Sequence, residues 1–333
     1  MGAVLRKMLR WFAGAFSFLV LVAGVALWFG SEVGRPGPLA ETKTIVIPRG
    51  VGVGPIAHVL ADAGVIRGAA LFEAAAFVAR FKGEREVRAG EYAFAKGASL
   101  LEILDQMRHG RTVVHRFVLI EGVTAAQVVA GLRAESALVG DVPEIPEEGA
   151  LLPDTYHFSL GDGRLALLQR MRAAMTVAKG ELWSVRAPGL ALQTQASAVV
   201  LASIVEKETA QASERSRIAG VFYNRLAIGM RLQSDPTVIY ALTGGKGGLG
   251  RLLTQADWRY ESPFNTYQIE GLPPRPICNP GRASLAAAFN PERHEYLYFV
   301  ADGSGGHVFA KTLAEHNHNV AHWRQLQHEH SPQ

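Results

Sequence analysis

Two carboxylates at the end of one apolar stretch are the residues whose type and spacing best suit chemistry. The stretch, residues 193–209, reads QTQASAVVLASIVEKET and predicts a helix that ends in Glu206 and Glu208. At about 100° per residue, these two side chains lie about 200° apart and face opposite sides of the helix. Glu208 continues the apolar stripe through Leu201 and Ile204, whereas Glu206 lies on a more polar side.

A carboxyl group at the end of a buried stripe is partly desolvated, which favours its neutral form. A general acid must be neutral at the working pH, so this position suits Glu208 to that role. The alternative is that both glutamates are solvated residues at a fraying helix end. On spacing alone, that alternative is the more common one, because charged residues are mostly exposed.

Other catalytic constellations are weaker in this sequence. Ser203 has no surrounding GxSxG motif. The single cysteine, Cys278, excludes an internal disulfide and a cysteine-based zinc site. A histidine group near the C-terminus has no HExxH pattern, and we interpret it as solvated, so we expect no metal and no cofactor. Glycosidases usually need a second carboxylate, and Asp235 and Glu261 are candidates without a sequence signal that requires either.

The composition fits a protein with two domains and a real core. The chain has 333 residues and a formal net charge of +4, with its basic residues spread along the sequence. This dispersion argues against a nucleic-acid partner and permits an anionic polymer or a membrane surface.

Residues 11–30 form a run of twenty residues without charge, which is long enough to cross about 30 Å of hydrocarbon as a helix. Basic residues precede this run, so residues 1–10 are expected to be a cytoplasmic tail, and everything after the run lies outside the cytoplasm. A cleavable signal peptide is the alternative. We favour a retained transmembrane helix because the apolar run is long for a signal. Residues 31–42 are typical of a linker.

The remainder predicts an α+β fold: a small α+β module at residues 43–116, a mixed helix and strand domain at 117–325, and a tail at 326–333. Ser99 and Glu102 form a capping box that opens a helix. Further along, the pattern predicts Ser213 as the N-cap of one helix and Asp235 as the N-cap of the next. Residues 296–301 and 307–309 predict a strand pair.

Long motifs, in order, resemble the endolytic murein transglycosylase family over essentially the whole chain after the apolar run. They are LLPDTYHF (151–158), LASIVEKET (201–209), ASERSRIAGVFYNRLAIGMRLQSDPTVIY (212–240), FNTY (264–267), GLPPRPICNPG (271–281) and YLYFVADGSGGHVFAKT (296–312). Leu152 and Cys278 are small departures from the family pattern.

This resemblance implies lytic cleavage of peptidoglycan glycan strands between N-acetylmuramic acid and N-acetylglucosamine. The family's catalytic glutamate corresponds to Glu208, which would protonate the glycosidic oxygen and then take the proton from the muramoyl C6 hydroxyl. The product would be a 1,6-anhydromuramoyl end, which explains why no second carboxylate is required. Gln233, Asn265 and Tyr267 would line the cleft, and residues 43–116 would form a LysM-like module that contacts glycan.

The resemblance also implies a location and partners. The protein would be a single-pass protein of the cell inner (plasma) membrane, with its catalytic domain on the periplasmic, cell-wall side. It would act beside peptidoglycan synthases and terminate or trim nascent glycan chains. Two alternatives stay open: a muramidase that admits water, and a non-catalytic wall-binding scaffold for synthases.

Overall fold

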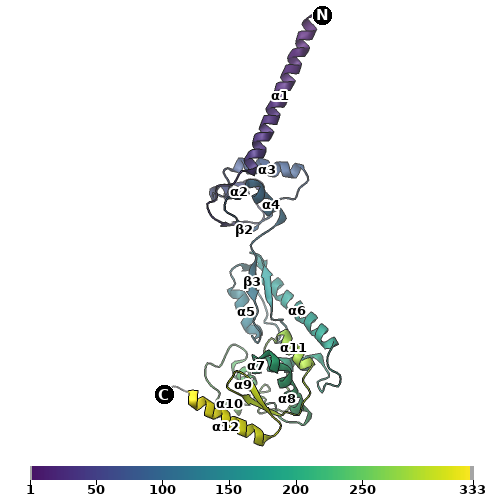
Figure 1. The fold of residues 1–333 in the computed structure, drawn as a ribbon, viewed down its shortest axis with the longest axis vertical. Coiled ribbons are helices and arrows are strands. Elements are labelled where there is room, and N and C mark those ends of the chain that lie inside the picture. The colour runs from purple at the N-terminus through teal and green to yellow at the C-terminus, as the bar shows by residue number, and fades with distance from the viewer. Residues whose placement is uncertain (1, 331–333) are drawn as a thin grey trace. The chain divides into compact units, whose positions relative to one another are not determined.

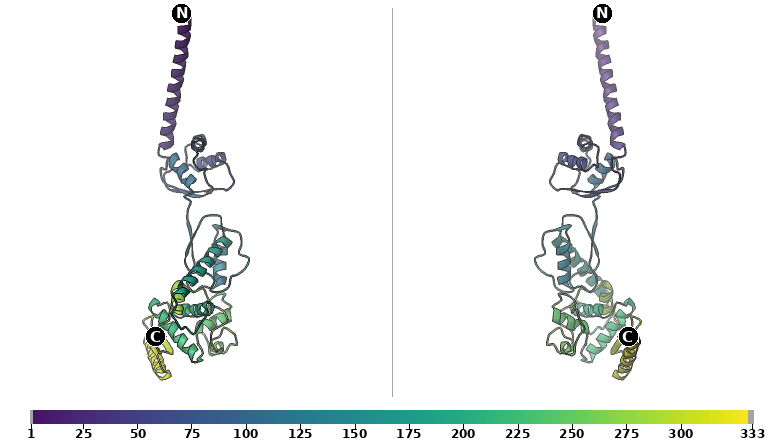
Figure 2. Two further views of the ribbon diagram at one scale, coloured as in Figure 1. Left: turned by 90° about the vertical axis from the view of Figure 1, so that its right-hand side faces the viewer. Right: turned by 90° about the vertical axis from the view of Figure 1, so that its left-hand side faces the viewer.

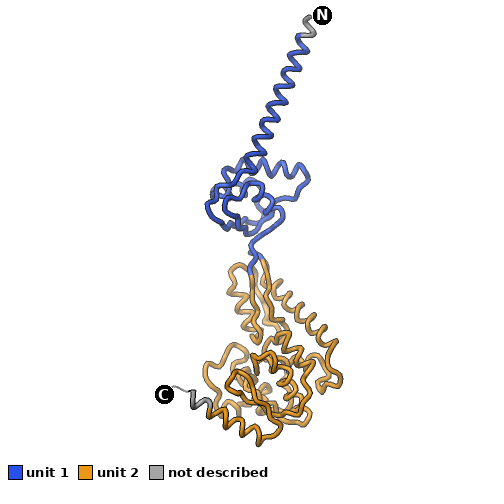
Figure 3. The backbone as a smooth tube through the Cα atoms, in the orientation of Figure 1, with its two compact units in different colours: residues 1–115, 159–161 blue, residues 116–158, 162–333 orange. Residues whose placement is uncertain are grey.

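The computed structural model describes residues 2–330, with side chains described for residues 6–325. The described chain forms two compact units (Figure 3). The N-terminal unit comprises the residues up to 115 together with 159–161, and the C-terminal unit comprises the remaining residues. Both units mix helices with short strands, which confirms the mixed fold class (Figure 1).

The N-terminal unit begins with α1 (Gly2–Gly34), a single helix of 33 residues. From Arg6 to Gly34 it is long and apolar enough to cross a membrane, and its most apolar window is not buried within the protein. This confirms the predicted apolar helix. Its C-terminal end joins the core of the unit, because Val33 is buried there and Phe29 packs against the same cluster.

The rest of this unit is a two-stranded sheet covered by helices. β1 (Lys43–Ile47) pairs antiparallel with β2 (Gly90–Phe94), so that Ile45 lies opposite Tyr92. The helices are α2 (Val53–Asp62), α3 (Ala69–Phe81) and α4 (Leu100–His109). The predicted capping box of Ser99 and Glu102 is present at the start of α4.

Three strand pairs shape the C-terminal unit. β3 (His115–Val118) pairs with β5 (Thr155–Phe158), and β4 (Leu138–Val139) pairs in parallel with β6 (Asp162–Gly163). β7 (Tyr298–Ala301) and β8 (His307–Ala310) form the predicted antiparallel pair, with Ala301 opposite His307.

The helical elements of this unit supply most of its core. They are α5 (Ala125–Ala134), α6 (Arg164–Ser184), α7 (Gln195–Glu208), the 3₁₀ turn η1 (Ala212–Glu214), α8 (Arg215–Ala227), α9 (Asp235–Thr243), α10 (Gln255–Trp258), α11 (Arg282–Phe289) and α12 (Leu313–His330). α12 packs on the β7–β8 pair at the outside of the unit (Figure 2).

The central helix is α7, which packs against α8, α9 and α11. All residues from 198 to 205 are buried, so α7 is covered on every side rather than along one stripe. A helix that is apolar all round is a buried core helix, which explains the long apolar run. The predicted contrast between an apolar side and a polar side of this helix is therefore wrong.

Two predicted helix starts are displaced by one residue. The 3₁₀ turn η1 precedes α8, whose N-cap is Glu214 rather than Ser213. The N-cap of α9 is Ser234, which leaves Asp235 as the first helical residue. At the C-terminus, α12 extends to His330 and therefore covers much of the expected tail, while residues 331–333 lie outside the described residues.

Candidate active site

The end of α7 presents Glu208 to the segment that leads into α9. Thr194 caps the start of α7 by accepting a hydrogen bond from the Ser197 N–H. Thr209 follows Glu208 in an extended conformation, so the chain leaves the helix directly after the carboxylate. Glu208 is thus the last helical residue, and its side chain remains partly accessible while protein atoms surround most of it.

Ser234 is the direct partner of Glu208. Its hydroxyl donates to Glu208 Oε1 at 2.5 Å. Ser234 occupies the N-cap position of α9, yet its side chain makes no capping bond there. The Ser234 hydroxyl therefore binds the carboxyl group at the end of α7 instead of capping the first turn of α9.

The backbone before Ser234 is held in an uncommon conformation. Gln233 has φ +49°, a left-handed value that side-chain-bearing residues adopt rarely and at some conformational cost. The Gln233 N–H donates to the Thr266 carbonyl at 3.2 Å, and the Ser234 N–H donates to Thr266 Oγ1 at 2.9 Å. Thr266 therefore fixes the turn that aims Ser234 at Glu208, and the exposed Gln233 side chain lies at this turn.

Burial raises the pKa of Glu208 to about 7. The hydrogen bond from Ser234 favours the carboxylate and lowers this pKa, whereas the negative charge of Asp235 raises it. His307 and Arg225 contribute smaller lowering effects. The net result is a carboxyl group that is protonated in a large fraction of molecules at neutral pH, as a general acid requires.

Asp235, beside Ser234, is held by two aromatic donors. The Tyr267 hydroxyl donates to Asp235 Oδ1 at 2.7 Å, and Trp258 Nε1 donates to the same oxygen at 2.9 Å. The two aromatic rings lie 5.9 Å apart. Burial raises the pKa of Tyr267 above its usual value, and the bond to Asp235 adds to this effect, so the phenol stays neutral and remains a donor.

Asn265 contacts the backbone of both aromatic residues. It is fully buried, and its side-chain amide donates to the backbone carbonyls of Trp258 (3.1 Å) and Tyr260 (2.7 Å). Its Oδ1 accepts from the Tyr267 N–H at 3.0 Å. Both ends of the amide are thus used inside the loop, and Asn265 fixes the position of Tyr267.

His307, which influences the pKa of Glu208, forms a hydrogen-bonded pair with Glu214 that the sequence did not indicate. His307 Nδ1 lies 2.7 Å from Glu214 Oε2, and the His307 N–H donates to Glu214 Oε1 at 2.8 Å. Burial opposes the charged form of Glu214, but the hydrogen bonds from His307 outweigh it, and the pKa of Glu214 lies below its usual value. Only the contact between η1 and β8 brings these two residues together.

Glu206 has different surroundings from Glu208. Its side chain is 4% exposed, its Oε2 accepts from the Gly281 N–H at 2.8 Å, and its Oε1 lies 3.4 Å from the Arg215 guanidinium. Arg215 also lies 3.4 Å from Glu121. A Cβ atom at Gly281 would lie 1.9 Å from Glu121 Oε1, so a larger residue there would require the Glu121 side chain to move. These contacts join α7, α8 and the 271–281 loop.

A pocket of about 250 Å³ lies beside the end of α7. The pocket is lined by Lys207, which precedes Glu208 in sequence, and by Pro236, which follows Asp235. Tyr240 and the glycine-rich loop that contains Gly245 complete the lining. Within the described part of the chain, no group of three or more His, Cys, Asp or Glu side chains gathers in a way that would hold a metal ion.

Comparisons with known proteins assign this chain to a family. A model described as the YceG-like family matches residues 45–322. A Bacillus subtilis (strain 168) protein named endolytic murein transglycosylase is 32% identical over 336 residues, covering 89% of this chain and 89% of the relative. A protein of the same name from Streptococcus pneumoniae (serotype 2 strain D39) is 30% identical over 93% of this chain and 65% of the relative.

A crystal structure of a protein described as YceG-like, from Listeria monocytogenes, also matches. It has 32% sequence identity and a TM-score of 0.50, and the match covers 84% of this chain and 99% of that chain. The family model and the curated relatives agree with the resemblance that the motifs indicated. The chain therefore belongs to the YceG-like family, whose relatives compared above carry the name endolytic murein transglycosylase.

Proposed function

We propose that this protein is an endolytic murein transglycosylase that cleaves peptidoglycan glycan strands with Glu208 as its only acid and base. The names of the relatives support the reaction class. The observation that carries the mechanism is the Glu208 carboxyl group, whose pKa is raised to about 7 by burial and which a hydroxyl donor holds in place.

The first step is proton transfer to the leaving group. Protonated Glu208 donates its proton to the glycosidic oxygen between N-acetylmuramic acid and N-acetylglucosamine. The bond between this oxygen and the muramoyl C1 breaks, and positive charge develops at C1. The N-acetylglucosamine side leaves as an alcohol, and Glu208 is left as a carboxylate. Ser234 holds Oε1 throughout and stabilises this charge, so Oε2 is the oxygen that we assign to the proton transfer.

The second step closes the ring within the sugar. The Glu208 carboxylate takes the proton from the muramoyl C6 hydroxyl, and O6 attacks C1 to form the 1,6-anhydro product. This returns the proton to Glu208, so the cycle balances without water. Asp235 lies close enough to influence the pKa of Glu208, and its negative charge would favour the positive charge that develops at C1.

Substrate contacts follow from accessibility. Gln233 is exposed and Tyr267 is partly exposed beside Asp235, so we assign both to the sugar-binding cleft. Asn265 is fully buried, and we assign it to positioning Tyr267 rather than to touching the glycan. We assign the pocket beside Lys207 and Pro236 to the continuation of the glycan chain.

We also propose that α1 is a retained single-pass anchor in the cell inner (plasma) membrane, with a short cytoplasmic tail and both units on the wall side. The length and apolar character of the helix support this placement. We further propose that residues 43–116, nearly all of which belong to the N-terminal unit, act as a LysM-like module that contacts glycan. The enzyme acts beside peptidoglycan synthases, where cleavage terminates or trims nascent chains.

The experiment that tests the function is product analysis of digested sacculi by mass spectrometry. The full-length protein should release glycans with 1,6-anhydromuramoyl ends, and Glu208→Gln should abolish this release while the protein stays folded. Glu206→Gln is the matched control, because it makes the same change two residues away outside the proposed chemistry. Reducing ends would mean hydrolysis by water instead, and full activity of Glu208→Gln would refute the assignment of Glu208.

A further inference from the structure

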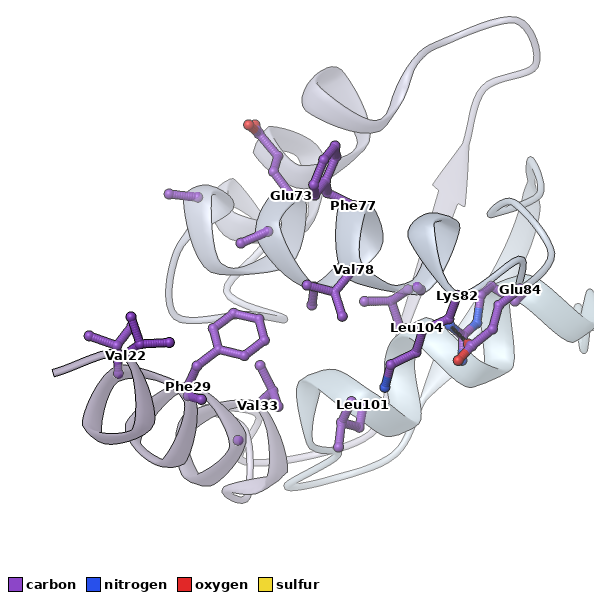
Figure 4. Close-up of a pocket in the computed structure, with 18 of the residues that line it drawn as sticks. Val22, Phe29, Val33, Glu73, Phe77, Val78, Lys82, Glu84, Leu101 and Leu104 are labelled. Carbon is purple, nitrogen blue, oxygen red and sulfur yellow. Dashed lines mark ion pairs between the residues drawn. The ribbon is translucent and has the colours of Figure 1, made fainter. Parts of the chain in front are cut away.

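The N-terminal unit carries a large apolar groove that holds none of the candidate catalytic residues. The groove has a volume of about 1260 Å³ and lies between the C-terminal half of α1 and the helices α3 and α4. Figure 4 shows Val22, Phe29 and Val33 on the α1 side, and Phe77 and Val78 on the α3 side. Both walls are therefore built mainly from hydrocarbon.

The α3 side of the groove continues into an exposed apolar edge. Phe77 is 70% exposed and Phe81 is 87% exposed. Two exposed phenylalanines one turn apart, joined to an apolar groove, form a patch of the kind that marks an interaction site. The opposite face of α3 already packs into the core of the unit through Phe72 and Ala75, so the internal core does not use this edge.

The position of α1 indicates what covers this patch. Apart from Val33, the α1 wall runs from Leu21 to Gly30 and belongs to the uncharged run of residues 11–30 that we assign to the membrane. α1 is continuous to Gly34, and Val33 is already buried in the core of the unit. At 1.5 Å per residue, Val33 lies about 5 Å beyond the end of the run, within the headgroup layer. The first residues of the predicted linker, 31–34, are therefore helical, and Val33 joins the apolar run directly to the core of the unit.

The charged groups around the groove do not oppose contact with lipid. Lys82, Glu84 and Arg108 lie at one end, where Arg108 forms an ion pair with Glu84. Glu73 lies on the α3 side in Figure 4. These formal charges sum to zero, so attraction of the groove to a bilayer would come from its apolar walls, and the long charged side chains at its rim can extend toward headgroups.

We propose that outer-leaflet phospholipid fills this groove and that the Phe77–Phe81 edge of α3 inserts into the membrane interface. This inference rests on the proposed membrane anchor. Lipid is the favoured occupant because one wall of the groove is the spanning helix itself, which acyl chains surround. The N-terminal unit is then seated on the bilayer instead of moving freely above it, and any glycan contact must use its remaining faces.

Fluorescence quenching in proteoliposomes tests this seating. The full-length chain is reconstituted into vesicles of phosphatidylethanolamine and phosphatidylglycerol that carry nitroxide groups on their acyl chains. A single environment-sensitive probe is attached at Phe77→Cys. The native Cys278 is fully buried and should not react. Val46→Cys, on an exposed position of β1 outside the groove, is the control within the same unit, and Phe18→Cys reports on the proposed span.

The proposal expects strong quenching at Phe77→Cys and at Phe18→Cys, with little at Val46→Cys. Quenching at Phe18→Cys without quenching at Phe77→Cys would overturn the seating and leave the anchor intact. Loss of quenching at both positions would refute the anchor itself. A probe at Phe77→Cys that is shielded from lipid nitroxides, and more so at higher protein density, would mean that a second copy fills the groove, which also overturns the proposal. Folding of each variant is checked by its circular dichroism spectrum.

Discussion

The two sides of the α7 C-terminus hold the same residue type in different surroundings. On one side, Glu206 receives a backbone N–H from Gly281 and lies beside the Arg215 guanidinium. On the other, Glu208 accepts a hydrogen bond from the neutral Ser234 hydroxyl and has the negative Asp235 nearby, while His307 and Arg225 act on it more weakly. Burial and the negative charge of Asp235 favour the acid form of Glu208, whereas the contacts of Glu206 join α7 to the neighbouring elements. Glu206 and Glu208 are only two residues apart, yet the contacts of Glu206 indicate a structural role and those of Glu208 support the proposed catalytic role.

The largest expected effect is on catalysis. Glu208→Gln should lower the rate of glycan cleavage by about 10²- to 10⁴-fold, because an amide can neither donate nor accept the proton. Glu206→Gln should retain most of the rate. The measurement is the initial rate of anhydro-product release by equal amounts of folded protein. If both variants lost activity equally, the contrast between the two sides would fail.

The next effect is on stability at the Glu206 side. Glu206→Ala should lower the free energy of unfolding by about 3 kcal/mol, because it leaves the Gly281 N–H without its acceptor and leaves the mostly buried Arg215 with Glu121 alone. Urea denaturation monitored by circular dichroism measures this change. The control is Glu181→Ala, which breaks an exposed ion pair with Arg282 and should change stability by less than about 1 kcal/mol. Equal losses in the two variants would contradict the structural role of Glu206.

A smaller effect of opposite sign is expected at Glu208. Its folded-state pKa is raised to about 7, so the stability associated with the protonated form is present at low pH and is lost as the pH rises toward and through 7. Glu208→Gln removes this loss, and the variant should be more stable than the native protein by roughly 2 to 3 kcal/mol at pH 9, with no such gain at pH 4. Thermal melts at both pH values check it; a gain that did not depend on pH would exclude this cause.

The smallest effect concerns Ser234. Because its hydrogen bond favours the carboxylate of Glu208, Ser234→Ala should raise the pKa of the catalytic acid and move the alkaline limb of the kcat/KM profile upward by about one pH unit. In the native protein this limb should fall near pH 7, since the acid must be protonated to act. Ser234→Thr keeps the hydroxyl and should keep the native limb. A downward shift in Ser234→Ala would mean that the hydroxyl stabilises the acid form instead.

Local patterns in the sequence predicted several of the helices and strands. The helix at 193–209, the capping box at Ser99 and the strand pair near residues 298–310 all appear in the structure. Each depends on residues close together in the chain, where propensity and periodicity act directly. The apolar helix α1 belongs to the same class, because length and composition alone define it.

The surroundings of the two glutamates could not be predicted in this way. Ser234 reaches Glu208 across 26 residues of sequence, and Gly281 reaches Glu206 across 75. The burial of Asn265 likewise depends on how its loop folds back over Trp258. Such contacts require the packed arrangement of several helices and loops, which periodicity does not encode.

The sequence by itself determined that a helix ends in two nearby carboxylates and that the following motifs belong to a transglycosylase-like chain. Only the tertiary structure decided which partners each carboxylate meets. α7 is buried on every side, so the apolar stripe that favoured Glu208 does not distinguish the two residues. Their difference arises because α8 and the 271–281 loop bring a cation and an N–H to Glu206, whereas the start of α9 brings a hydroxyl to Glu208.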